Sequence, residues 1–150
     1  MYYGALEAGG TKMVCAIGDA DKNIIDRISI PTGTPDQSVP AMIDYFKKYD
    51  ISALGIGTFG PADINPNSPT YGSIMRSPKK DWEGFSLYKA FTDALGCLVV
   101  VDTDVNAAAW GEYLYGALKG LNSGMYLTVG TGIGGGIISD GRLIHGMEHP

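Results

Sequence analysis

Apolar residues recur along this chain in the short runs and alternations that are typical of β-strands. The alternation I-I-D-R-I-S-I over 24–30 predicts a half-buried strand. Short apolar runs bounded by turn residues predict further strands over 1–6, 13–17, 52–58 and 98–101, and the run L-V-V-V at 98–101 predicts a fully buried one. Because short turns join the first three strands, we expect them to form an antiparallel meander.

Helical spacing begins after this meander. Four apolar residues (Val39, Met42, Ile43 and Phe46) fall at i, i+3, i+4 and i+7. The predicted helices cover 36–49, 85–95, with Gly96 as a stop signal, and 104 to about 118. The proline-bearing stretch 62–83 between them reads as irregular. Irregular segments longer than about 12–15 residues in compact domains are commonly functional.

The last part of the chain returns to strands. Residues 126–129 and 136–138 are predicted to be strands joined by the loop T-G-I-G-G, and a third strand begins at Arg142. The order is therefore a strand meander, an alternation of strands and helices, and the beginning of a second meander. This order predicts an α/β fold with a mixed sheet, and it suggests an internal duplication whose second copy is cut short.

Composition narrows the class of protein. Charged residues make up 18% of the chain and apolar residues 45%, which is enough for a packed core. A net charge of −5 without a basic cluster argues against nucleic acid and against anionic membrane surfaces as partners. The two cysteines, Cys15 and Cys97, favour a reduced intracellular protein. Since neither a secretory signal nor an 18-residue apolar stretch is found, we expect a soluble, cytoplasmic protein.

Three glycine-rich or acidic turns each follow a predicted strand, where α/β proteins place their sites. The first is E-A-G-G-T-K at 7–12. Glycines supply the positive φ of a tight turn, and successive N–H groups in such a turn can bind an anion. Thr11 adds a hydroxyl donor, Lys12 adds a positive charge, and Glu7 could hold a hydrated Mg²⁺ against a phosphate. A plain hairpin turn with surface charges is the simpler interpretation.

The second turn is G-T-G-I-G-G-G at 130–136. It satisfies G-x-G-x-x-G, but a dinucleotide site needs a helix to begin at the last glycine, and a strand is predicted there instead. No phosphate-binding loop of the type G-x-x-x-x-G-K-[ST] is present either. Five glycines among seven residues cost backbone entropy on folding. Close approach of the backbone to a ligand phosphate and a structural hairpin both remain open as explanations.

The third turn is D-T-D-V-N at 102–106, between the L-V-V-V strand and the following helix. An aspartate at the start of a helix commonly serves as the N-cap. The same placement would let Asp104 face a ligand hydroxyl, orient it and accept its proton during phosphoryl transfer. Both interpretations stay open on the sequence.

The histidines, serines and lysines outside these turns predict no further catalytic or metal site. His145 and His149 lie four residues apart, but no helix is predicted there, so a metal site made from them is not expected. No G-x-S-x-G motif is present to begin a Ser-His-Asp triad. The lysine pairs at 47–48 and 79–80 stand among polar or acidic neighbours, and we interpret both as solvated surface.

Taken together, the turns resemble one family. The segments E-A-G-G-T-K (7–12), G-I-G-T-F-G-P (55–61), D-T-D-V-N-A-A-A-W-G-E (102–112) and L-T-V-G-T-G-I-G-G-G (127–136) are similar, in order and spacing, to the ROK family of bacterial sugar kinases. The resemblance implies the actin-like ATPase (ribonuclease H-like) fold, in which ATP and sugar lie between two similar α/β domains. Residues 1–117 would be the N-terminal domain and 118–150 the opening hairpin of the second.

The resemblance also implies a role for each turn. The residues that match ATP-binding positions are Gly9, Gly10, Thr11, Lys12, Gly130, Thr131, Gly132, Gly134 and Gly135. Asp104 matches the catalytic base on the sugar hydroxyl, and Gly60, Pro61 and Thr103 join it as sugar-binding positions. Glu7 stands where many relatives have aspartate, and its role in binding Mg²⁺ should survive that exchange.

Some departures indicate the substrate. Thr103 stands where glucokinase-like members commonly have asparagine, and this departure, the E-A-G-G-T-K opening and the H-G-M-E-H-P segment are similar to the fructokinase branch. We therefore expect ATP-dependent phosphorylation of fructose. The alternatives are a glucose or N-acyl-hexosamine kinase and a non-catalytic sugar sensor. Sensors of the family carry an N-terminal helix-turn-helix, for which the six residues before Glu7 leave no room.

Length is the main departure, because family members are about twice as long. The chain stops before the expected sugar-binding glutamate and the His/Cys motif for a structural Zn²⁺, so zinc is expected only from residues beyond 150. We expect a homodimer in the full-length form. The isolated 150 residues should be weakly active or inactive, because they lack half of the cleft.

Overall fold

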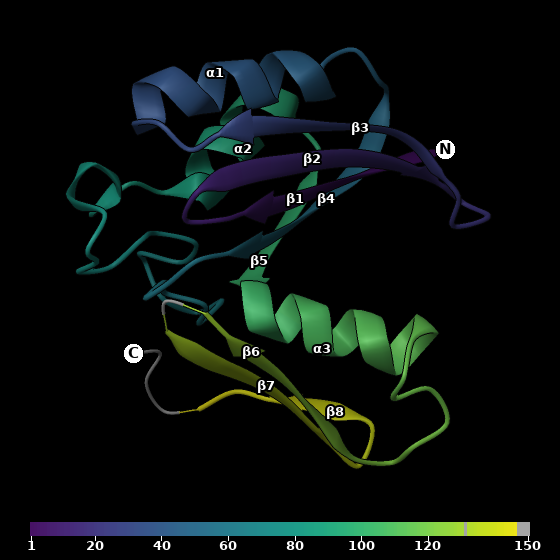
Figure 1. Cartoon of the computed structure of the whole chain (residues 1–150). Helices are drawn as coiled ribbons and strands as arrows, with labels where there is room; N and C mark the ends of the chain where they lie inside the picture. The colour runs from purple at the N-terminus through teal and green to yellow at the C-terminus, as the bar shows by residue number, and fades with distance from the viewer. Residues whose placement is uncertain (131, 147–150) are drawn as a thin grey trace.

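The computed structural model describes residues 1–130 and 132–146, which form two β-sheets on opposite sides of one helix (Figure 1). The five-stranded sheet has the order β3-β2-β1-β4-β5, with β1 (Tyr2–Ala8), β2 (Lys12–Asp19), β3 (Ile24–Pro31), β4 (Ile51–Thr58) and β5 (Leu98–Thr103). The three-stranded sheet consists of β6 (Gly124–Val129), β7 (Ile133–Ser139) and β8 (Arg142–Ile144). The described helices are α1 (Pro35–Phe46), α2 (Leu87–Leu95), α3 (Asp104–Tyr115) and a short 3₁₀ helix, η1 (Lys80–Trp82).

The five-stranded sheet is mixed, as predicted. Strands β1, β2 and β3 form the antiparallel meander, whereas β4 pairs in parallel with β1 and with β5. Strands β6, β7 and β8 pair as a second antiparallel meander, which confirms the three strands predicted in the last part of the chain. The internal duplication stays a prediction. A domain boundary near residue 117 stays a prediction, because α3 packs against both sheets.

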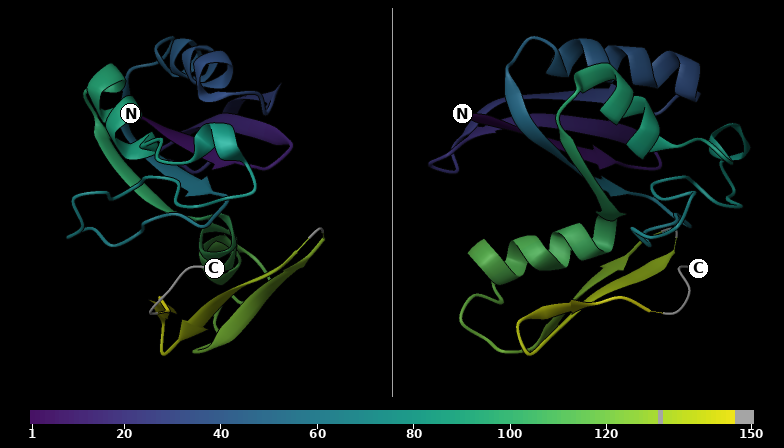
Figure 2. Two further views of the ribbon diagram at one scale, coloured as in Figure 1. Left: turned by 90° about the vertical axis from the view of Figure 1, so that its left-hand side faces the viewer. Right: turned by 180° about the vertical axis from the view of Figure 1, so that it is seen from behind.

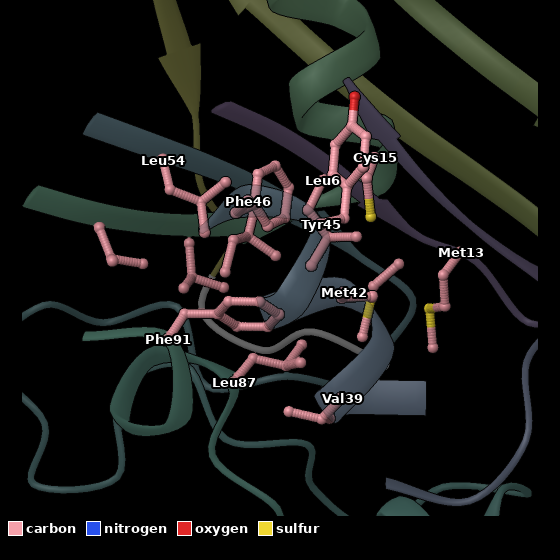
Figure 3. Close-up of a cluster of buried hydrophobic side chains, with 14 of the residues drawn as sticks. Leu6, Met13, Cys15, Val39, Met42, Tyr45, Phe46, Leu54, Leu87 and Phe91 are labelled. Atoms are coloured by element: carbon pink, nitrogen blue, oxygen red, sulfur yellow. The ribbon is translucent and has the colours of Figure 1, made fainter. Parts of the chain in front are cut away.

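The main core lies between the five-stranded sheet and the helices α1 and α2 (Figure 3). The apolar positions of the predicted helical spacing face this core, where Met42 and Phe46 are fully buried. The rings of Phe46 and Phe91 meet edge to face with their centroids 6.1 Å apart, which joins α1 to α2. Burial of these side chains holds both helices on one face of the sheet.

Local capping signals set the helix ends. Thr34 and Gln37 form a capping box at the start of α1. At the start of α2, the Ser86 side chain accepts the N–H of Lys89. Gly96 ends this helix in the left-handed conformation with φ of 64°, which confirms the predicted stop signal.

The expectation that the L-V-V-V strand is fully buried is wrong. In β5, Val99 and Val101 are buried, but Leu98 is 66% exposed and Val100 is 53% exposed. The alternation arises because α1 and α2 cover only one face of the sheet, and β5 is its edge strand. On the other face, α3 packs against the carboxyl ends of the strands and leaves their beginnings uncovered (Figure 1).

The predicted loop between the last strands is also too long. Residues 133–135 belong to β7 rather than to a loop, and Thr128 pairs with Gly134. A Cβ atom on Gly136 would collide with the carbonyl oxygen of Val105 and lie 2.7 Å from Cβ of Ala109. A Cβ on Gly134 would lie 2.8 Å from Cγ1 of Val105. These two glycines therefore let the backbone of α3 lie directly on the second sheet.

None of the helices within 1–130 and 132–146 has both the length and the apolar character needed to cross a bilayer. The longest of them, α1 and α3, have 12 residues each. A membrane-spanning helix needs about 20 apolar residues.

The contact between Gly136 and α3 yields a stability prediction. Gly136→Ala should lower the free energy of unfolding by about 2–3 kcal/mol, because the added methyl group collides with helix backbone that cannot move freely. Denaturant unfolding measures this difference. The neighbouring Gly135→Ala is the control, since its Cβ would make only ordinary contacts, at 3.4 Å from the Leu127 side chain and 3.9 Å from the carbonyl oxygen of Tyr126. Equal losses in the two variants would contradict the packing role of Gly136.

Candidate active site

Two carboxylates flank a glycine on one face of the five-stranded sheet, near the carboxyl ends of its parallel strands. Glu7 pairs with Gly57, and Gly57 pairs with Asp102, so the three residues form one row across β1, β4 and β5. A Cβ on Gly57 would lie 2.9 Å from Cβ of Ala107. The missing side chain therefore allows the first turn of α3 to pack on the sheet between the two carboxylates.

A groove of about 740 Å³ runs along this row. Its lining includes Glu7, Gly57, Asp102, Asp104, Trp110 and Tyr126. Two of the residues singled out from the sequence, Glu7 and Asp104, thus face one depression although they are 97 positions apart in the chain. The strand register and the position of α3 bring them together.

Asp104 is the first residue of α3 and does not cap it. The N-cap is Thr103, whose hydroxyl oxygen accepts the N–H of Asn106 at 3.1 Å. Oδ1 of Asp104 accepts the N–H of Val105 at 2.8 Å, and its Oδ2 makes no hydrogen bond with the described residues. The N-cap interpretation therefore applies to Thr103, and one carboxylate oxygen of Asp104 is left for other partners.

Asp102 is the centre of a hydrogen-bond network that the sequence did not suggest. Its Oδ1 accepts the N–H of Thr103 and the side-chain amide of Asn106, both at 2.7 Å. Its Oδ2 lies 2.9 Å from Nε2 of His145, which follows β8. One carboxylate thus connects the end of β5, the first turn of α3 and the second sheet. No local signal pairs residues 43 positions apart, so sequence reasoning missed the contact.

A second cavity, of about 840 Å³, lies on the other side of the Thr103 turn. It is lined by the segment after β4 and by the second sheet, including Asn65, Thr103, Asn106, Gly134, Gly135 and His145. Thr103 is fully buried, and its hydroxyl oxygen already accepts one hydrogen bond, so its O–H donor and one lone pair remain for a ligand. A sugar contact by Thr103 stays a prediction.

The predicted sugar-binding pair Gly60-Pro61 follows β4 and is joined by a cis peptide bond. Both residues are half-buried, and the carbonyl oxygen of Pro61 accepts the N–H of Met75 at 2.8 Å. The long irregular segment is therefore anchored beside the carboxyl end of β4. The sugar contact of this pair also stays a prediction.

Tyr71, from the same irregular segment, completes the edge of the sheet at β5. Its hydroxyl accepts the N–H of Val101 at 2.8 Å and donates to the carbonyl oxygen of Val101 at 2.9 Å. Burial raises the pKa of Tyr71, so the hydroxyl keeps the proton that it donates. The Tyr71 side chain thereby satisfies the edge hydrogen-bonding groups of Val101 that a further strand would otherwise satisfy. Val101 directly precedes Asp102.

The turn between β1 and β2 is held closed by its own backbone. Gly9 donates its N–H to the carbonyl oxygen of Lys12 at 3.0 Å, and a Cβ on Gly9 would lie 2.6 Å from that oxygen. Neither Gly9 nor Gly10 has a positive φ, so the expectation of a left-handed turn residue is wrong, and close approach explains Gly9 instead. Thr11 and Lys12 are exposed at this turn.

The second glycine turn joins β6 to β7 on the same side of the molecule as the first (Figures 1 and 2). Gly130 donates its N–H to the carbonyl oxygen of Gly132 at 2.9 Å, and a Cβ on either glycine would stand in open space. Thr131, which the resemblance assigns to ATP binding, lies outside the described residues. Gly134 packs against α3, and this packing explains why position 134 is a glycine without invoking a ligand.

Metal-binding groups are sparse in the part of the chain that the structure describes. Within 1–130 and 132–146, no three His, Cys, Asp or Glu residues are grouped so that they could hold a metal ion. Burial raises the pKa of the Cys15 thiol to about 12, which keeps it protonated and unsuited to zinc. Glu7 is exposed and fits a Mg²⁺ ion held mainly by phosphate oxygens and water, which needs one or two carboxylates.

The fold and the site together define the protein class. The mixed five-stranded sheet of this order and the second meander match solved ROK kinases, which have the actin-like ATPase fold. The model of the ROK family matches residues 3–150, and the chain belongs to that family.

Individual relatives agree with this assignment. The chain is 46% identical to the fructokinase of Lactococcus lactis subsp. cremoris and 43% identical to that of Pediococcus pentosaceus, over 99% of its own length in both cases. It superposes with a TM-score of 0.83 and 31% identity on 47% of a ROK family glucokinase from Streptomyces griseus, solved with glucose and AMPPNP. The chain spans 50% and 52% of the two fructokinases, about half the length of these curated relatives.

The edge contact of Tyr71 yields a prediction. Tyr71→Phe should destabilise the protein by about 1–3 kcal/mol, because it leaves the N–H and the carbonyl group of Val101 without partners. Tyr88→Phe is the matched control, since the Tyr88 ring lies 4.9 Å from that of Tyr71 but its hydroxyl bonds to none of the described residues. Chemical unfolding of both variants measures the difference. A loss in Tyr88→Phe as large as in Tyr71→Phe would refute the role of the hydroxyl.

Proposed function

We propose that this chain is the N-terminal part of an ATP-dependent hexose kinase whose substrate is fructose. The observation that carries the proposal is 43–46% identity to two fructokinases over nearly the whole chain, in a fold that brings Asp104 and Glu7 to one groove. The related glucokinase, which holds glucose and AMPPNP, supports a sugar and an adenine nucleotide as the ligands.

Asp104 is proposed as the base in the transfer. Its free Oδ2 would accept the proton of the sugar hydroxyl as the hydroxyl oxygen attacks the γ-phosphorus of ATP and ADP leaves. The position at the first residue of α3 suits a carboxylate, because the positive end of the helix dipole stabilises its charge. Thr103 keeps this position in place by capping the helix, so Asp104 is not needed for capping.

The two glycine turns are proposed to bind the phosphates. In the first turn, the N–H groups of Gly10 and Thr11 make no hydrogen bond with the described residues, and Lys12 supplies a positive charge. Such groups stabilise the negative charge of a transferring phosphoryl group. The second phosphate-binding turn would be the one between β6 and β7 of the other sheet, which carries Gly130 and Gly132. Mg²⁺, with Glu7 as its protein ligand, would neutralise charge on the phosphate oxygens.

We propose fructose rather than another hexose for two reasons. These are the identity to the fructokinases and the threonine at position 103, where glucokinase-like members commonly have asparagine. The identity to the two fructokinases exceeds the 31% identity to the glucokinase structure. A glucose or N-acyl-hexosamine kinase would use the same phosphate-binding groups, and only the groups that contact the sugar would differ. A homodimer of the whole kinase and a zinc site beyond residue 150 remain predictions of the family resemblance.

The role of Asp104 can be tested by one isosteric change. Asp104→Asn should lower kcat at least about 100-fold, because it removes the proton acceptor but keeps the shape of the side chain. The measurement is a coupled assay of ADP release with fructose as substrate. It uses a longer chain that also contains the part corresponding to the C-terminal half of the relatives. Asp36→Asn is the matched control, since Asp36 lies in the first turn of α1 and lines neither cavity.

A turnover number in Asp104→Asn close to that of Asp36→Asn would exclude Asp104 as the base. A panel of fructose, glucose, mannose and N-acetylated hexosamines tests the substrate in the same assay. Selective turnover of fructose supports the proposal, and preference for another hexose replaces fructose without affecting Asp104. The 150 residues alone are expected to turn over sugar weakly or not at all.

A further inference from the structure

Lys79 lies across the turn between β1 and β2, although the two segments are almost 70 residues apart in the chain. Its Cε atom stands 3.5 Å from the place that a Cβ on Gly10 would occupy. The residue is half-buried, whereas its neighbour Lys80 is exposed. Part of the Lys79 side chain is therefore covered, and of these two lysines interpreted as solvated surface only Lys80 is exposed.

A series of hydrogen bonds fixes this position. Thr32 joins the turn through its N–H to the carbonyl oxygen of Thr11 at 3.0 Å and through its hydroxyl to that of Gly9 at 2.8 Å. The carbonyl oxygen of the next residue, Gly33, accepts the indole N–H of Trp82 at 2.9 Å. Because the turn is bonded to Thr32 and the last residue of η1 is bonded to the adjacent Gly33, Lys79 has a defined place beside Gly10.

Trp82 makes this link rigid. It is 1% exposed, and its ring packs edge to face on Phe59 and Phe85 with centroid distances of 5.8 and 5.5 Å. Lys79 is the residue that precedes η1, and its N–H donates to the Ser77 hydroxyl at 3.2 Å. The backbone of Lys79 is thus held on both sides of the residue.

The charge of Lys79 has no partner in the described part of the chain. No carboxylate oxygen there lies within ion-pair distance of its ammonium group, whereas Nζ of Lys80 lies 3.3 Å from Oε2 of Glu83. The free N–H groups of Gly10 and Thr11 stand at the same turn, as does Lys12. Two lysines from distant segments therefore stand at this turn, and neither forms an ion pair with the described residues.

We propose that Lys79 is a second phosphate-binding lysine of the turn between β1 and β2 and acts together with Lys12 on a polyphosphate chain. The proposal rests on the proposed function, since it adds a residue to the same nucleotide site. Held ammonium groups and N–H donors form charge-assisted hydrogen bonds with phosphate oxygens. The ligand class is a linear polyphosphate, either free or as the tail of a nucleoside triphosphate.

The test is a titration of the ¹⁵N-labelled 150-residue protein with inorganic tripolyphosphate and, separately, with ATP. The amide signals of Gly10 and Thr11 report on the turn. Lys79→Met removes the charge but keeps the apolar stem over Gly10, Lys79→Arg keeps the charge, and Lys80→Met is the matched control. Thermal unfolding of each variant verifies that it is folded.

In the wild type, both ligands should shift the amide signals of the turn. Lys79→Met should raise the Kd for tripolyphosphate about five- to tenfold, because one charge-assisted contact is lost at a partly exposed, screened site. Lys79→Arg should stay within about twofold of the wild type, because a guanidinium group also binds phosphate. Lys80→Met should bind as the wild type does.

Two results would overturn the inference, and they are distinguishable. If Lys12→Met weakens binding but Lys79→Met does not, Lys79 only covers Gly10 with its stem, and the proposed nucleotide site survives. If the wild type binds neither ligand at the turn, the nucleotide site of the proposed function fails and Lys79 fails with it. Binding of tripolyphosphate but not of ATP, with a loss in Lys79→Met, supports Lys79 and restricts the ligand to free polyphosphate.

Discussion

The close packing of α3 between the two sheets is the constraint on which the rest of the structure depends. On one side, the helix approaches Gly57 so closely that a Cβ on this glycine would lie 2.9 Å from Cβ of Ala107. On the other side, Gly136 brings the second sheet against the backbone of Val105. Because there is no side chain at these contacts, the start of α3 lies at the carboxyl ends of β4 and β5. Asp104 thereby enters the same groove as Glu7.

Polar contacts then define the orientation of this helix start. Thr103 caps the helix, and Asp102 joins the N–H of Thr103, the amide of Asn106 and the imidazole of His145. The contact between Asp102 and His145 is partly exposed, so its contribution to stability is modest, and its main effect is geometric. It holds the end of β8 against the turn that carries Asp104, and in this way it couples the second sheet to the candidate active site.

Both sheets also present apolar surface that no other element within 1–130 and 132–146 covers. On the five-stranded sheet this face includes Leu98 and Val100 of β5. On the three-stranded sheet it consists of Met125, Leu127, Val129, Ile133 and Ile137, which the strand register places together. Uncovered apolar surface of this extent commonly marks a contact with further structure. The chain spans about half the length of the fructokinases that it resembles.

The sequence alone determined the elements and the chemical character of the turns, because strand alternation, helical spacing and capping residues act over a few positions. It therefore predicted the meander, the helix that carries Val39 and Phe46, and the stop at Gly96. The tertiary structure decided which glycines serve packing, that Thr103 rather than Asp104 caps α3, and that β5 has an open face. It also decided that Asp102 meets His145 and that Lys79 meets Gly10, because such contacts join segments whose separation in the chain carries no periodic signal.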